Sequence, residues 1–274
     1  MDVDDDETPV AERDDLPSSS NRRRVDIGTG AKRQAAAGLA SKLRKTDSMI
    51  TDTSPKPEAP QPFVRLRYQL AKLVYDNMFP LIVHAGSWQE DLFGSFAPRA
   101  GDRILDFGRG SSFSSISLAL RYPDAQIVEM EASREAAARV HAKAIRKRIG
   151  NLSVVVAPLH GPLPFHAGSF DKVVCRLGLH DIQPKEKLAL LKEVARVIRR
   201  LGAFHVAEFD KAESPGEGSI LELASRISGH AAVAAHIDGT WTEFLARSGF
   251  SSIRQQSSHS VGFGRISVTR ARKR

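Results

Sequence analysis

The chain has 274 residues, 41% of them hydrophobic and 26% charged, which is enough for one catalytic domain with appendages. Its apolar residues occur in short runs, well below the roughly 20 residues that a membrane-spanning helix needs. The acidic amino terminus lacks the composition of a secretory or mitochondrial leader. Cys175 is the only cysteine, which excludes a disulfide framework or a thiolate zinc site within one chain. We therefore expect a soluble, cytoplasmic protein without a transmembrane segment.

The formal charge of +8 is unevenly distributed along the chain. Residues 1–60 contain 10 Lys and Arg against 12 Asp and Glu, which leaves 30 against 20 for residues 61–274. Such an excess of basic side chains steers association with anionic partners, such as lipid headgroups or nucleic acid. The alternative interpretation is that these charges simply solvate the surface.

The amino-terminal part of the chain predicts little regular structure. Residues 1–60 contain almost no aromatic or large apolar side chains, so we expect a disordered tail. Within it, residues 31–45 are Ala-rich and basic, which permits a short amphipathic helix that could contact an anionic membrane. Apolar residues then recur at helical spacing from Phe63 to Met78, so we expect residues 61–97 to form a helical cap.

From Arg103 onward, short apolar strands alternate with longer amphipathic helices. This alternation predicts an α/β domain over residues 98–274, with a Rossmann-like, doubly wound, mostly parallel sheet of seven strands and an antiparallel pair of strands at its edge. We expect strands at 103–107, 126–131, 152–156, 170–176, 203–208, 252–256 and 265–270, and helices at 113–121, 133–149, 184–200 and 239–248.

The turn after the first strand carries the most informative motif. Asp106 ends the strand, and Gly108 and Gly110 follow in the turn. In a doubly wound sheet, ligands bind at the carboxyl ends of the strands, and glycines let a ligand approach the backbone. A dinucleotide site would need a third glycine where the chain has Phe113, and Asp106 would repel a pyrophosphate. The turn therefore favours a cationic ligand.

This turn resembles the D-x-G-x-G loop of class I S-adenosylmethionine-dependent methyltransferases. The resemblance implies that S-adenosyl-L-methionine is the cofactor, that Asp106 acts near its methionine amino group, and that Gly108 and Gly110 lie under it. Arg109 and Ser112 replace residues that are common in the loop of this family.

The acid at the end of the second strand matches the family's ribose-binding position. A carboxylate there can accept hydrogen bonds from both ribose hydroxyls, so the resemblance implies this role for Glu131. Glu129 faces the same side of an ideal strand, so a register two residues earlier stays open. Leu159 or His160 falls where the family usually has an aspartate that binds the adenine amino group, and losing that hydrogen bond costs about 1 kcal/mol.

Three further segments resemble the same family in the same order. They are Gly161–Val174, Glu193–Gly202 and Phe244–Phe250. No N-P-P-Y or D-P-P-Y element follows the fourth strand, so the resemblance is to the quinone and small-molecule branch rather than to the nucleic-acid branch. The branch implies a small-molecule acceptor.

Catalytic residues are harder to predict, because methyl transfer from a sulfonium often needs only alignment of the acceptor, with a base when the acceptor is a hydroxyl. His180 follows the fourth strand, where acceptor and cofactor should meet, and is the candidate base; the alternative is a histidine that merely lines the pocket. Tyr75 resembles the tyrosine of a Tyr-Asp pair found in this branch, and Trp88 and Phe93 could form a wall for the substrate or simply pack. The histidines show no ligand-like spacing, so we expect no metal site.

These patterns predict an enzyme that transfers the methyl group of S-adenosyl-L-methionine to a small apolar or amphiphilic acceptor. The altered glycine loop motivates the alternative of a catalytically inactive binding or scaffold protein with the methyltransferase fold. A third hypothesis is methylation of protein or RNA, for which salt-sensitive binding to nucleic acid would be the sign.

Overall fold

The structure is a computed structural model that describes residues 69–75, 77, 87–109 and 111–274. All of these residues belong to Pro60–Arg274, the larger of the two units into which the chain divides. The predicted tail and Gly110 lie outside the described residues. Residues 69–75 and 77 are helical, as expected within the predicted cap.

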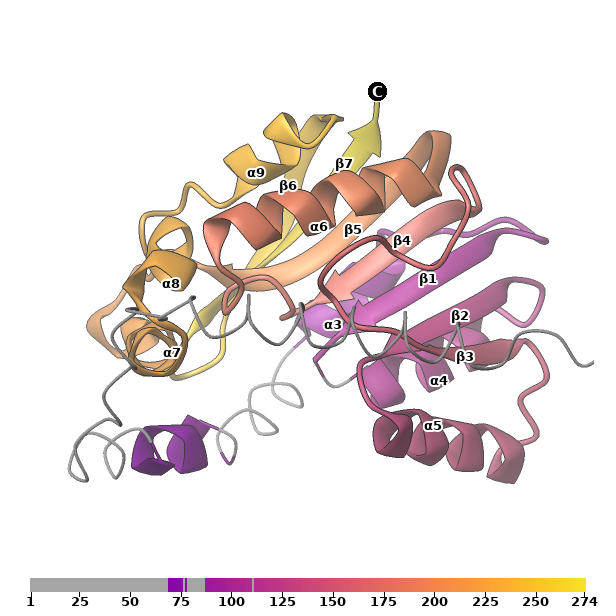
Figure 1. Cartoon of the computed structure of the whole chain (residues 1–274), viewed down its shortest axis with the longest axis horizontal. Helices are drawn as coiled ribbons and strands as arrows, with labels where there is room; N and C mark the ends of the chain where they lie inside the picture. The colour runs from indigo at the N-terminus through magenta and orange to yellow at the C-terminus, as the bar shows by residue number, and fades with distance from the viewer. Residues whose placement is uncertain (1–68, 76, 78–86, 110) are drawn as a thin grey trace, which may run out of the picture. The chain divides into compact units, whose positions relative to one another are not determined.

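The unit Pro60–Arg274 contains a seven-stranded sheet in the order β3-β2-β1-β4-β5-β7-β6 (Figure 1). Strands β3, β2, β1, β4 and β5 are parallel to one another, whereas β7 is antiparallel to both β5 and β6. The Rossmann-like fold and the antiparallel pair at the edge of the sheet are therefore confirmed. The strands are β1 (Arg103–Gly108), β2 (Gln126–Glu131), β3 (Leu152–Val156), β4 (Phe170–Arg176), β5 (Ile198–Asp210), β6 (Phe250–Ser260) and β7 (Arg265–Lys273).

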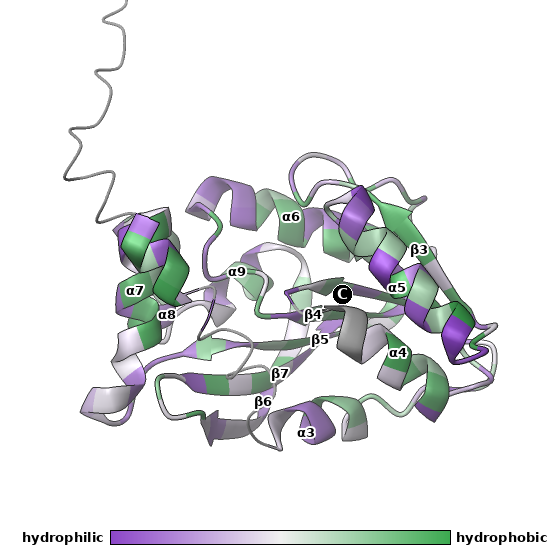
Figure 2. Ribbon diagram, turned by 90° about the horizontal axis from the view of Figure 1, so that it is seen from below, coloured by the Kyte–Doolittle hydropathy of each residue, from purple (hydrophilic) through white to green (hydrophobic). Residues whose placement is uncertain are grey.

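Helices cover both faces of this sheet, and Figure 2 shows polar and apolar residues alternating along α5 and α6, as amphipathic helices require. None of the described helices combines the length and the apolarity needed to cross a bilayer. The helices are α3 (Trp88–Gly94), α4 (Ser111–Arg121), α5 (Arg134–Arg146), α6 (Pro184–Val197), α7 (Ser219–Ser228), α8 (His230–Ile237) and α9 (Thr242–Arg247), with a short 3-10 helix, η2 (Pro215–Gly218).

Two parts of the predicted secondary structure need correction. Helix α6 ends at Val197 rather than at residue 200, because Ile198 has an extended backbone and pairs with Phe170 of β4. Helices α7 and α8 were not predicted. They have 10 and 8 residues and are separated by Gly229, whose φ is 87°, so neither fills the window of about 11 to 18 residues in which helical periodicity is recognised.

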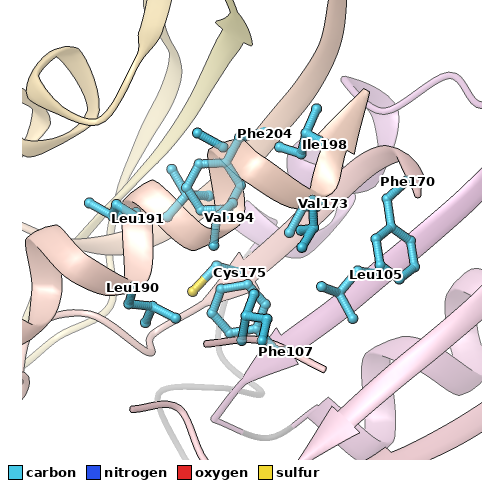
Figure 3. Close-up of a cluster of buried hydrophobic side chains, with 14 of the residues drawn as sticks. Leu105, Phe107, Phe170, Val173, Cys175, Leu190, Leu191, Val194, Ile198 and Phe204 are labelled. Atoms are coloured by element: carbon cyan, nitrogen blue, oxygen red, sulfur yellow. The ribbon is translucent and has the colours of Figure 1, made fainter. Parts of the chain in front are cut away.

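The sheet separates two buried hydrophobic clusters, one on each face. The first joins α3, α4 and α7 to the sheet and includes Trp88 and Phe93, which therefore pack in the core. The second lies under α6 and α9, and Figure 3 shows side chains of β1, β4, β5 and α6 interdigitating there. Because successive side chains of a strand point to opposite faces, Ile104 belongs to the first cluster and Leu105 to the second. Because the helices cover the two faces of the sheet, a ligand can reach the sheet at the carboxyl ends of its strands.

Candidate functional site

A cavity of about 300 Å³ lies at the carboxyl ends of β1, β2 and β4, a volume at the lower end of the range of small-molecule pockets. This is the topological switch point of the sheet, where doubly wound folds bind ligands. Four of the six residues predicted to bind the cofactor line this cavity, namely Gly108, Glu131, Leu159 and His160. Of the other two, Gly110 lies outside the described residues, and Asp106 is buried and does not line the cavity.

Main-chain atoms form the floor of the cavity where β1 and β4 end. Gly108 has a φ of 122°, and a Cβ atom there would lie 2.2 Å from the carbonyl oxygen of Arg176. A Cβ atom on Gly178 would lie 3.1 Å from the Gly108 Cα atom. The backbone N–H of Arg109 donates to the same Arg176 carbonyl at 2.8 Å, which holds the turn against β4. Position 108 therefore requires glycine for both its backbone conformation and its close contact with β4.

The structure distinguishes between the two acids of β2. The carboxylate of Glu129 is buried and accepts a hydrogen bond from the Ser115 hydroxyl of α4. Glu131 ends the strand, lines the cavity, and is followed by Ser133, whose hydroxyl caps α5 by accepting from the Ala136 N–H at 3.1 Å. Glu131 is therefore the acid that faces the cavity, in the register that the sequence motif indicated.

The substitution Glu131→Gln should weaken binding of the nucleoside ligand by about 10-fold to 100-fold, because hydrogen bonds to a charged acceptor are worth about 1.5–3 kcal/mol. Isothermal titration calorimetry with purified protein would measure this change. Glu135→Gln, in the first turn of α5, removes an equal charge outside the cavity and should leave the affinity unchanged. Equal affinity of Glu131→Gln and the wild type would show that this carboxylate does not bind the ligand.

Asp106 does not line the cavity. Its carboxylate is fully buried, forms an ion pair with the Arg176 guanidinium at 3.0 Å, and accepts from the Ser114 hydroxyl at 3.2 Å. Burial raises the pKa of this carboxyl above its ordinary value, and Arg176 opposes that effect. The Arg176 guanidinium already pairs with this carboxylate. The expected role of Asp106 near the methionine amino group therefore stays a prediction.

Other acids give the cavity its negative charge. The ionisable lining groups are the carboxylates of Glu131, Asp181 and Glu186 against the guanidinium of Arg109, so three negative charges and one positive charge leave −2 with His160 neutral. Arg109 forms an ion pair with Asp181 and lies 5.4 Å from the centre of the Tyr75 ring. The cavity therefore keeps a net negative charge although Arg109 lines it. Asp181 and Glu186 are lining residues that the motif of the glycine loop could not indicate.

A second, smaller cavity of about 30 Å³ lies between the helical residues 69–75 and α7. Tyr75 and Lys72 line it from one side, and Ala224, Ile227 and Ser228 line it from α7. It shares Arg109 and Asp181 with the first cavity. The ion pair of Arg109 and Asp181 is therefore the boundary between the two cavities.

His180 connects this second cavity to a buried acid. The Tyr75 hydroxyl lies 2.5 Å from Nε2 of His180, and Nδ1 of His180 lies 2.7 Å from Oε1 of Glu208. Backbone N–H groups of Leu179 and Phe209 also donate to the Glu208 carboxylate, at 2.7 and 2.9 Å. Burial raises the pKa of Glu208, but His180, with smaller contributions from His236 and the Phe209 N–H, outweighs it and lowers the pKa to about 2. The ionised acid fixes the proton of His180 on Nδ1, so that Nε2 accepts from Tyr75.

The expected position of His180 is thus corrected in one respect. His180 is fully buried and lines neither cavity, because Tyr75 covers its Nε2 atom, whereas Tyr75 itself lines the second cavity. Tyr75 is therefore the member of this chain of hydrogen bonds that borders a cavity.

A buried lysine lies behind this arrangement, between α6 and α8. The Lys187 ammonium donates to the Ala232 carbonyl at 2.9 Å and to Nε2 of His236 at 3.1 Å. Nδ1 of His236 donates to the Phe209 carbonyl at 2.8 Å. Burial lowers the pKa of Lys187 to about 8 and that of His236 to about 3, so His236 is neutral and accepts from the lysine. These contacts attach α8 to α6 next to the His180 ring.

Comparison with known proteins agrees with this geometry. A family of methyltransferase domains matches residues 104–202, which include β1 except its first residue, β2, β4 and the residues that line the cavity. The ubiquinone/menaquinone biosynthesis C-methyltransferase UbiE of Rhizobium johnstonii is 25% identical over 197 residues, covering 67% of this chain and 73% of that protein. These similarities support a class I S-adenosylmethionine-dependent methyltransferase. The alternative of a catalytically inactive relative finds no support in these matches.

Two further relatives of this methyltransferase share its fold or part of its sequence. The demethylmenaquinone methyltransferase of Beutenbergia cavernae is 31% identical over 122 residues, which are 44% of this chain and 47% of that protein. The crystal structure of a SAM-dependent methyltransferase from Aquifex aeolicus aligns with a TM-score of 0.53 at 18% identity, covering 68% of this chain and 89% of that one. The structural match shows the Rossmann-like fold.

S-adenosyl-L-methionine is the cofactor of this methyltransferase, and the residues of the first cavity fit it. The backbone floor at Gly108 and Gly178 accommodates a ligand in close contact, and Glu131 at the tip of β2 would accept hydrogen bonds from the ribose hydroxyls. The charge of −2 around the cavity suits a cationic sulfonium.

Proposed function

We propose that this methyltransferase methylates an aromatic carbon of a small, hydroxylated, quinone-type acceptor. The chain of hydrogen bonds from Tyr75 through His180 to Glu208 carries the proposal, because it ends at the cavity next to the cofactor cavity. The names of the two curated relatives, one a C-methyltransferase of quinone biosynthesis and the other a demethylmenaquinone methyltransferase, support the acceptor class. A ring acceptor would enlarge the second cavity by displacing the helical residues that carry Lys72 and Tyr75.

The proposed mechanism uses the side chains of this chain to ionise the acceptor. When bound, S-adenosyl-L-methionine supplies an electrophilic methyl group on a sulfonium. Tyr75 accepts the proton of the acceptor hydroxyl while its own proton passes to Nε2 of His180, and Glu208 stabilises the resulting imidazolium. The ring carbon next to the phenolate forms a bond to the methyl carbon as the carbon–sulfur bond breaks. The ring hydrogen then leaves as a proton, so that one proton is released for each methyl group transferred.

Turnover with reduced benzoquinone and naphthoquinone acceptors tests this proposal. We expect a product with the mass of one added methylene group, and with a carbon–methyl signal rather than an oxygen–methyl signal in its nuclear magnetic resonance spectrum. The variant Glu131→Gln should lose turnover at low cofactor concentration and recover at high concentration. Exclusive methylation of oxygen, or turnover only with a protein or RNA acceptor, would contradict the proposal.

The cellular setting is also proposed here. The absence of a spanning segment among the described helices and the basic excess over residues 61–274 support a cytoplasmic enzyme that contacts anionic membranes peripherally. We also propose the boundaries of the tail (1–60), the cap (61–97) and the catalytic domain (98–274), which rest on the composition and hydrophobic periodicity of the sequence. Fractionation of cells that places the chain in an exported fraction would contradict this setting.

A further inference from the structure

A polar groove of about 350 Å³ lies on the antiparallel pair β6 and β7, separate from both cavities described above. The register of β6 shifts between Ser251 and Arg254 and again between Gln255 and Ser257, which marks two irregularities around Arg254. Such β-bulges change the direction of side chains at sheet edges. The groove is lined by Ser252, Arg254, Gln256, Arg270 and Arg272.

Three guanidinium groups meet in this groove without a carboxylate. Arg254 lies directly opposite Arg270 in the β6–β7 register, an arrangement that destabilises a sheet when both side chains carry the same charge. In the described part of the chain, no acid forms an ion pair with Arg254, Arg270 or Arg272. The groove therefore concentrates positive charge that the protein itself does not compensate.

Arg270 shows this lack of compensation at the level of one atom. Its Nε atom is buried and has no hydrogen-bond partner among the described residues. On its other side Arg270 lies opposite His205 of β5, and burial, reinforced by Arg270 and Lys172, lowers the pKa of His205 to about 3. The neighbouring ring is thus neutral and supplies no counter-charge, while Lys172 has its own partner in Asp102 at 3.1 Å.

We propose that this groove binds the phosphate group of an anionic ligand. Guanidinium groups match phosphate oxygens in a bidentate geometry, and all five lining residues are polar, so an apolar ligand is disfavoured. Arg272 pairs with Ala203 of β5, and Ala203 pairs with Lys172 near the start of β4. The cofactor cavity lies at the other end of β4, so the groove and the cavity are toward opposite ends of the strands. Binding here is therefore independent of the proposed methyl acceptor.

Calorimetric titration of the full chain with inorganic phosphate and with pyrophosphate, at low salt, tests the proposal. We expect one site, with affinity falling at least about tenfold in Arg270→Gln and in Arg254→Gln. Arg254 is exposed, so its variant should fold normally. Arg146→Gln removes the same charge from α5, which packs at the β3 edge of the sheet, and should leave phosphate affinity unchanged. Binding of S-adenosyl-L-methionine should not change in any of the three variants.

Vesicles distinguish the two sources of such a phosphate group. Binding to vesicles that contain phosphatidic acid, but not to phosphatidylcholine alone, with the same dependence on Arg254 and Arg270, assigns the group to a lipid headgroup. Binding of the free anions without vesicle binding assigns it to a soluble ligand. The proposal is overturned if neither probe binds, if Arg146→Gln weakens binding as much as the groove variants, or if a single-stranded oligonucleotide binds more tightly with the same arginine dependence.

Discussion

Replacing Asp106 by alanine should lower the free energy of unfolding by about 3–5 kcal/mol, because the buried Arg176 guanidinium would lose its carboxylate partner. Both side chains are at most 1% exposed, and the two groups are 3.0 Å apart. Removing one member of such a pair leaves a charge in a medium that solvates it poorly, which is worse than removing both. Urea-induced unfolding at neutral pH, followed by circular dichroism, would measure the change.

The matched control is the double variant Asp106→Leu with Arg176→Met. Replacing a buried ion pair by apolar side chains of similar size is often neutral or stabilising, so this protein should be clearly more stable than Asp106→Ala. If Asp106→Ala unfolds at the wild-type urea concentration, the ion pair does not stabilise the fold. Cofactor binding of the double variant then separates the two roles, because retained affinity would show that Asp106 acts through the fold rather than on the ligand.

Tyr75→Phe and His180→Gln should each lower the rate constant of methyl transfer by about 100-fold to 10,000-fold, the range expected for the loss of acid–base assistance. Tyr75→Phe removes only the hydroxyl that lies 2.5 Å from His180, and leaves the ring under Arg109 in place. His180→Gln removes the group that accepts the tyrosine proton. Neither side chain lines the cofactor cavity, so the affinity for S-adenosyl-L-methionine should be unchanged.

Acceptors of graded acidity show whether this chain moves a proton. If Tyr75 and His180 ionise the acceptor hydroxyl, then an acceptor with an electron-withdrawing substituent, which is already ionised at neutral pH, should lose much less rate in either variant. A purely structural role would reduce the rate equally for every acceptor. Equal losses across the series would therefore contradict the proposed proton transfer, even if the enzyme methylates quinone-type acceptors.

The local sequence pattern predicts the parts of the site that are built from one segment. The bounds of β2, β3 and β4 agree with the apolar runs, and the turn at Gly108 follows from its glycine and the acid before it. The choice between Glu129 and Glu131 could not be made by periodicity alone, because both point to the same side of the strand. The contact of Glu129 with Ser115 of α4, the helix before β2, shows which of the two acids is buried within the fold.

Contacts between distant segments explain what the sequence did not reveal. Asp106 and Arg176 are 70 residues apart, and Tyr75 and His180 are 105 residues apart. Neither pairing leaves a periodic signal, since only the winding of the sheet brings these positions together. The motif indicated an acid near the methionine amino group at position 106 and a histidine where acceptor and cofactor meet. In the folded chain, the acid has a buried partner and a tyrosine lies in front of the histidine.

The floor formed by Gly108 and Gly178 has a consequence for engineering the specificity of this enzyme. No side chain can be introduced at position 108, where even a methyl group would overlap the main chain of β4. Ligand preference can therefore be retuned only from the rim, where Leu159, His160 and Glu186 belong to loops or to the first turn of a helix. A library that randomises these three positions would explore new cofactor analogues while the backbone floor at Gly108 and Gly178 keeps its shape.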